Sequence, residues 1–281
     1  MIQTARETTK MSLASRFSDL ALRSDYAERI RARPGLALAA AAAAIGLVPA
    51  LRYAAASYAG YLALGKGGMP YNVYGWLLQA SLQVLGRWDL TTPAPYRDAA
   101  VIARFAPHGR ESFLAAPLPE RVGAAPEVPG YIAPQRQTSD AAAEEVQARM
   151  RAYLDAVVAA HPAVFAMKPS GLEGVGTPAI WLRGPAEGGA AELPSFLQKI
   201  KGETVHVHPE GSTHVTLSLA DAEDVVVKGW GQRHKLSGVA GYIPWSYVLV
   251  YAPRNDEEYE VWQSLVRAGC AFVAGGREIK V

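Results

Sequence analysis

Four of the six histidines lie in one short stretch, where their spacing brings imidazole side chains together. His206 and His208 alternate with valines, which is a strand pattern, because successive side chains on a strand point to opposite faces. The alternation resumes at His214 after a loop of residues 209 to 213. A hairpin that closes over this loop pairs His208 with His214, with Cβ atoms about 5 Å apart. One face of the predicted hairpin is apolar, and the other gathers three imidazoles with Thr216.

Three kinds of chemistry suit such a face. Imidazole nitrogens bind zinc at about 2.1 Å and also suit iron and copper, so the three histidines could hold a metal, with Glu210 or His234 as the only evident fourth ligand. A metal-free histidine could instead take a proton from an acidic substrate hydroxyl. The face could also be a solvated sheet surface. We favour metal-free catalysis or binding, because chance clustering of so many of the chain's histidines is improbable.

A second motif, Lys228 to His234 (KGWGQRH), follows closely. Two glycines beside Trp230 let the backbone approach a ligand next to an aromatic wall. The Arg233 guanidinium could donate two hydrogen bonds to a carboxylate or an enolate, and His234 adds a fourth imidazole. Alternatively, this segment is a structural turn in which Trp230 is buried in the core and Arg233 pairs with an acidic side chain. The polar cluster of residues 135 to 138 is predicted to be structural.

Periodicity predicts the elements that position these residues. A 3.6-residue pattern predicts helices, period-two or short apolar runs predict strands, and Asn255 with Glu258 forms a capping box. Strands joined by tight turns and flanked by helices predict an α+β domain with a mainly antiparallel sheet. Besides the histidine hairpin, the predicted helices cover residues 74–85, 139 or 140 to about 160, and 255–269, and the predicted strands cover residues 179–183, 225–227, 247–251 and 271–273.

The N-terminal part, residues 1–66, differs from the predicted domain of residues 67–281. An uncharged run from Pro34 to Leu51 lies between arginines and sits at the short end of the roughly 17–25 residues that span a bilayer. A second uncharged run, residues 53–65, carries interfacial tyrosines. These features predict a hydrophobic anchor helix, single-pass or peripheral, on an endomembrane with the basic N-terminus in the cytosol. The alternative is an alanine-rich helix packed on the protein's own surface or on a partner.

Overall composition excludes some function classes. The formal net charge is +2 and no long basic block occurs in the body of the chain, so we expect no nucleic-acid partner. The single cysteine, Cys270, excludes an internal disulfide and is expected to be a buried small hydrophobe.

Several segments together resemble the luciferase-domain family, which includes the luciferases of bioluminescent fungi. The segments VKGWGQRHKLSG, YVLVYAPRNDEE and ETVHVHPEGSTHVTLSLADA carry the resemblance, and LGKGGMPYNVYGWLLQ and QRQT fit more loosely. The resemblance implies an O2-dependent oxidation of a 3-hydroxy-α-pyrone of the 3-hydroxyhispidin type, through a bridged peroxide that loses CO2 and leaves a light-emitting product. It implies O2 as co-substrate and no flavin, ATP or added metal. The absence of a dinucleotide fingerprint or phosphate loop agrees with this.

The resemblance also implies roles for individual residues. One histidine would deprotonate the pyrone hydroxyl, Arg233 would steady the enolate, and Trp230 would form a wall of the substrate site. Dark relatives could oxidise or merely bind a related phenolic compound, so a metal-dependent three-histidine enzyme and a non-catalytic, membrane-tethered binding protein stay open as alternatives. The predicted catalytic residues are His206, His208, His214, His234 and Arg233, and the predicted substrate-binding residues are Trp230, Gln232, Lys228 and Thr216.

Overall fold

The computed structural model describes residues 32–189 and 192–281, so the basic tail predicted before residue 32 lies outside the described residues. The chain forms two compact units, divided between Gly60 and Tyr61. Helix α2 (Pro34–Ala63) contains most of the predicted anchor. In the described part of the chain no helix is both long enough and apolar enough to cross a membrane. The predicted spanning helix is therefore not supported, because alanine is weakly apolar and Arg52 interrupts the run.

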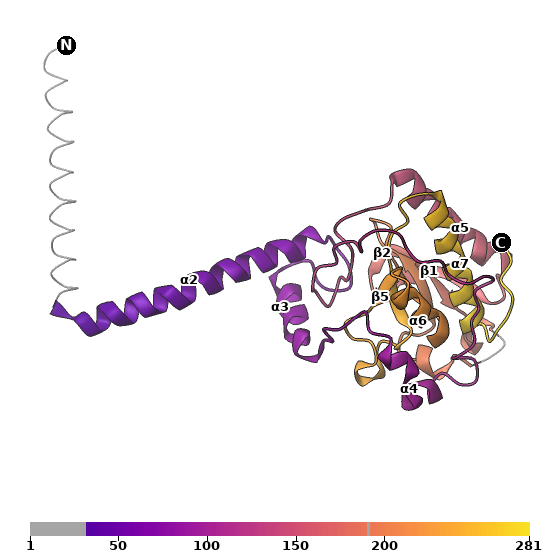
Figure 1. Ribbon diagram of the computed structural model, residues 1–281, viewed down its shortest axis with the longest axis horizontal. Coiled ribbons are helices and arrows are strands. Elements are labelled where there is room, and N and C mark those ends of the chain that lie inside the picture. The colour runs from indigo at the N-terminus through magenta and orange to yellow at the C-terminus, as the bar shows by residue number, and fades with distance from the viewer. Residues whose placement is uncertain (1–31, 190–191) are drawn as a thin grey trace, which may run out of the picture. The chain divides into compact units, whose positions relative to one another are not determined.

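An antiparallel sheet organises the second unit (Figure 1). It has six strands in the order β1-β2-β3-β4-β6-β5. All five strand pairings are antiparallel. Together with the helices, this sheet confirms the predicted α+β class. The strands are β1 (Phe165–Ser170), β2 (Gly174–Leu182), β3 (Glu203–Val207), β4 (Thr213–Thr216), β5 (Gly231–Arg233) and β6 (Tyr247–Val250).

Five further α-helices and several short 3-10 turns complete the described fold of this unit. Helix α7 begins after Asn255, whose side chain accepts a hydrogen bond from the Glu258 amide, as the capping box predicts. The helices are α3 (Val73–Leu82), α4 (Ala99–Ala103), α5 (Glu144–Ala160), α6 (Leu219–Val227) and α7 (Asp256–Val273). The 3-10 turns are η1 (Gln83–Leu85), η2 (Ala94–Arg97), η3 (Pro185–Glu187), η4 (Ser195–Leu197) and η5 (Val239–Gly241).

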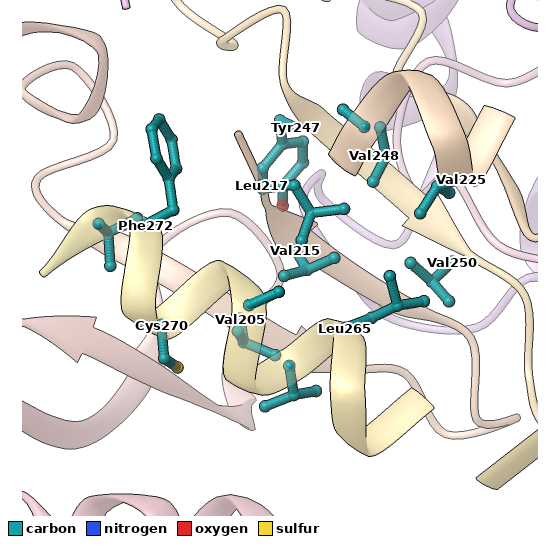
Figure 2. Packing of buried hydrophobic residues seen from close by; sticks show 14 of the residues in the cluster. Val205, Val215, Leu217, Val225, Tyr247, Val248, Val250, Leu265, Cys270 and Phe272 are labelled. Atoms are coloured by element: carbon teal, nitrogen blue, oxygen red, sulfur yellow. The ribbon is translucent and has the colours of Figure 1, made fainter. Parts of the chain in front are cut away.

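The hydrophobic core lies between one face of the sheet and the helices. Val205, Val215 and Leu217 point toward α7 and pack with Leu265 and Phe272 (Figure 2). Because strand side chains alternate, the histidines of β3 and β4 point to the opposite face. The apolar half of the predicted hairpin is thus confirmed as core, and it fixes the face on which the imidazoles lie.

Two predicted strands are wrong, because both segments are helical. Residues 225–227 end α6, whose first turn is capped when the Ser218 hydroxyl accepts a hydrogen bond from the Asp221 amide. Residues 271–273 continue α7, which does not stop at Gly269. A Cβ at Gly269 would lie 2.6 Å from Val215 Cγ2, so this glycine allows α7 to approach the sheet closely instead of ending the helix.

Candidate active site

The hairpin between β3 and β4 brings His206, His208 and His214 together, but its register differs from the prediction. His206, not His208, lies opposite His214. The turn is tighter than expected, because the His208 amide donates a hydrogen bond to the Ser212 carbonyl at 2.8 Å. The register has slipped by two residues, and a slip of two leaves every side chain on its original face. The three imidazoles therefore still share one face.

The three histidines form a compact and buried cluster. The Nε2 atoms of His206 and His208 are 3.2 Å apart, and one nitrogen from each of His206, His208 and His214 lies within 4.8 Å of the others. Each of the three residues is at most 2% exposed. The interpretation as a solvated sheet surface is therefore wrong, because loops cover this face.

The Nδ1 atom of His206 contacts a carboxylate, and that of His208 contacts a hydroxyl backed by a carboxylate. His206 Nδ1 lies 2.7 Å from Oε1 of Glu203. The same carboxylate accepts hydrogen bonds from the Ser170 hydroxyl at Oε1 and from the Gly171 amide at Oε2. His208 Nδ1 lies 2.8 Å from the Ser212 hydroxyl, which donates its only hydrogen to Glu210.

The hydrogens of this network can be counted. The Ser212 hydroxyl donates its hydrogen to Glu210, so it can only accept from His208, which must therefore carry a hydrogen on Nδ1. His206 must also carry a hydrogen on Nδ1, because its partner there is the Glu203 carboxylate, which only accepts. A neutral imidazole carries only one N–H, so two neutral rings would point two Nε2 lone pairs at each other across 3.2 Å. The pair therefore requires one positive centre at the Nε2 atoms, which is either an additional proton or a metal ion.

Glu173, in the turn between β1 and β2, is a site residue that the sequence analysis missed. Its Oε1 lies 3.6 Å from His208 Nε2, and its Oε2 accepts a hydrogen bond from Arg136. Arg136 also donates to the carbonyls of Leu64 at 2.7 Å and Lys66 at 2.9 Å. Arg136, from the cluster predicted to be structural, thus ties the loop at Gly67 to the carboxylate that faces the histidines.

Burial and neighbouring charges set the protonation of the site. Burial alone would raise the pKa of Glu173, but His208, His206 and Arg136 together lower it to about 2, so the side chain is ionised. Burial alone would lower the pKa of His208, but Glu173 and Glu210 outweigh it and raise that pKa. Burial lowers the pKa of His214 well below its ordinary value and that of His234 to about 4, so both rings are neutral.

A pocket of about 140 Å³ opens beside the cluster. His214 stacks on Tyr247 at a centroid distance of 4.6 Å, and His234 lies 5.6 Å from His214, centroid to centroid. The Leu236 amide donates to His234 Nδ1 at 3.0 Å, so the proton of that neutral ring is on Nε2. The site therefore combines a cationic centre, a carboxylate and a hydrogen-bond donor. The lining residues are Gly68, Met69, Ile132, Ala133, Gln135, Gly171, Leu172, Glu173, His214, His234, Leu236, Tyr242, Ile243 and Tyr247.

Of the predicted site residues, only His214 and His234 line this pocket, and His206 and His208 lie behind its wall. Trp230 lies in the core and donates from Nε1 to the Pro119 carbonyl at 2.6 Å. Arg233 is 1% exposed and donates to the carbonyls of Asp89 and Thr92. Three more predicted residues lie outside the pocket lining. Lys228 pairs with Asp224 at 2.7 Å, Gln232 accepts a hydrogen bond from the Tyr251 hydroxyl at 3.2 Å, and Thr216 is buried in β4.

Comparison with known proteins agrees with the resemblance in the sequence. A family model described as a luciferase domain matches residues 201–269. A luciferase of Armillaria ostoyae is 30% identical over 250 residues, which cover 85% of this chain and 88% of the relative. The chain belongs to the luciferase-domain family. A luciferase of Armillaria mellea is 29% identical over the same length, and one of Neonothopanus nambi is 37% identical over 87 residues, 29% of this chain and 32% of the relative. No solved structure matches significantly.

The luciferase-domain match contains all four histidines of the site but not the residues that complete it. Residues 201–269 run from the start of β3 into α7. Glu173 and Arg136 lie before this segment, and so do Gly68 and Met69 of the pocket wall. The family's core segment therefore supplies the imidazoles, and the preceding part of the chain supplies the acid and the covering loops.

Proposed function

We propose that this luciferase-family protein is an oxygenase that oxidises a 3-hydroxy-α-pyrone of the 3-hydroxyhispidin type with O2 and without flavin or ATP. The observation that carries the proposal is the buried histidine and carboxylate cluster at the wall of a pocket, in a chain that is 30% identical to a fungal luciferase. Cationic and hydrogen-bond donor groups beside an ionised acid suit a substrate that must become an enolate.

The pocket accommodates the reacting ring. Its volume of about 140 Å³ is below the roughly 300 Å³ at which pockets for larger ligands begin, so it holds the pyrone ring and not the whole molecule. The remainder of the substrate passes Tyr242, which is 51% exposed, toward solvent. His214 and Tyr247, stacked on each other, form an aromatic wall of the pocket, the role that the sequence analysis gave to Trp230.

The side chains then have distinct tasks. Glu173 accepts the proton of the pyrone hydroxyl, because it is the carboxylate that lines the pocket. The positive centre at His206 and His208 lies behind the pocket wall that Glu173 and His214 form, and from there it stabilises the negative charge of the enolate. His234 lines the pocket and offers its Nε2–H to the enolate oxygen. O2 adds across the electron-rich ring to give a bridged peroxide, and loss of CO2 leaves the carbonyl product. Substrate and O2 thus balance product and CO2, and no external reductant is required.

Replacement of the acid tests this assignment. Glu173→Gln keeps the shape of the side chain but removes the proton acceptor, and loss of a general base typically costs about 100- to 10,000-fold in rate. The control is Glu187→Gln, an exposed acid that pairs with Lys168 and does not line the pocket. We expect O2 uptake with 3-hydroxyhispidin to fall at least 100-fold in Glu173→Gln and to be unchanged in the control. Equal uptake by Glu173→Gln and the folded wild type would overturn the role of Glu173.

A further inference from the structure

The positive centre between His206 and His208 can be a proton or a metal ion. We propose that His206, His208 and His214 bind one divalent first-row transition-metal ion, such as Zn²⁺, with its open side toward the pocket. The expectation that no metal is added remains compatible with this site, provided that the ion stays bound through purification. The inference does not rest on the proposed oxidation, because it concerns the resting protein.

The spacing of the ring nitrogens fits a metal ion. With metal–nitrogen distances of about 2.0–2.1 Å, two imidazole nitrogens on a tetrahedral ion lie roughly 3.3 Å apart. The Nε2 atoms of His206 and His208 are 3.2 Å apart. The nitrogen of His214 lies within 4.8 Å of both, so a small rotation of one buried ring completes the set.

The groups around the histidines are those that support metal ligands. A ligating histidine almost always donates its other N–H to a carboxylate, a carbonyl or water, which fixes the tautomer and orients the ring. His206 donates to Glu203 at 2.7 Å, and His208 donates to Ser212 at 2.8 Å, backed by Glu210. Both Nε2 atoms therefore present lone pairs toward a common point, which is the arrangement that a cation needs.

The third histidine and the nearby acid complete the site. Nδ1 of His214 is buried and has no hydrogen-bond partner among the described residues, which is rare for a buried polar atom. Glu173 Oε1 lies 3.6 Å from His208 Nε2 and offers a fourth ligand or a counter-charge. His214 and Glu173 both line the pocket, so an ion here would be accessible to a small molecule bound there.

Metal content tests the proposal without any substrate. The full chain is treated with a chelator, dialysed, incubated with Zn²⁺ or Co²⁺, freed of excess ion and analysed by elemental mass spectrometry. His206→Asn removes a ligand, and His108→Asn is the matched control, because the His108 ring pairs with the Glu111 carboxylate in a loop outside the histidine cluster and does not line its pocket. Near-ultraviolet circular dichroism checks that each protein is folded.

We expect one equivalent of ion in the wild type and in His108→Asn, and less than a tenth of an equivalent in His206→Asn. Glu203→Gln keeps all three ligands and should weaken binding by about 10- to 100-fold, which provides a second test if His206→Asn does not fold. Folded wild type that binds no stoichiometric ion, or a His206→Asn variant that binds as the wild type does, overturns the metal site. A bound ion without oxygenase activity would refute the proposed oxidation and leave the metal site intact.

Discussion

Gly67 is the position where one added methyl group should disturb the site most. A Cβ there would lie 2.1 Å from Glu173 Oε2 and 2.3 Å from Arg136 Nη2, whereas ordinary contacts begin at 3.4 Å. The ion pair would have to move by about 1.3 Å, and both partners are buried. Overpacking of this kind costs about 2 kcal/mol. For a unit of this size the melting temperature should therefore fall by roughly 4–8 °C.

Activity should fall more steeply than stability in Gly67→Ala. A misplacement of about 1 Å can cost roughly 100-fold in turnover, and Glu173 is the group displaced. The assays are O2 uptake with 3-hydroxyhispidin at saturating concentration and thermal unfolding of the same preparation. The control is Gly176→Ala, because a Cβ at Gly176 meets nothing within 4 Å. A Gly67→Ala protein with wild-type turnover would refute the argument that Arg136 and this loop hold Glu173 in place.

Two further predictions concern the packing of α7 on the sheet. Gly269→Ala gains about 1 kcal/mol of helix propensity, but its Cβ would lie 2.6 Å from Val215 Cγ2 and 2.9 Å from the Thr216 carbonyl, so we expect a net loss of roughly 1–2 kcal/mol in urea unfolding. A stabilised variant would show that α7 can shift away from β4. Trp262→Phe removes the hydrogen bond from Nε1 to Thr213 Oγ1 at 2.8 Å, and we expect the free energy of unfolding to fall by about 2 kcal/mol. An unchanged urea midpoint would contradict this.

The sequence predicted the histidine face well because strand alternation is a local property. His206, His208 and His214 share one face whether or not the hairpin slips by two residues, so the error in register did not affect the prediction. The valine run at residues 225–227 was wrongly predicted to be a strand, because β-branched residues favour strands and the Ser218 helix cap was not recognised. The helix was also wrongly predicted to end at Gly269, because a glycine that permits close packing looks the same in sequence as one that ends a helix.

Residues of the site that come from distant segments could not be predicted. Glu173 lies in a short polar turn with no motif of its own, and only the pairing of β1 with β2 and of β2 with β3 brings it beside His208. Trp230 and Arg233 had the residue types expected of a substrate site. Their partners, the carbonyls of Pro119, Asp89 and Thr92, are more than a hundred residues away and leave no local signal.

We propose that a hydroxypyrone is oxidised by O2 in the pocket beside the histidine cluster. The most direct measurement is the amount of O2 consumed and CO2 released by the purified full chain with 3-hydroxyhispidin, with photons counted in the same vessel. We expect one CO2 to be released per O2 consumed, with or without light, and without added flavin or ATP. Folded protein that consumes no O2, or that consumes O2 and releases no CO2, would contradict it.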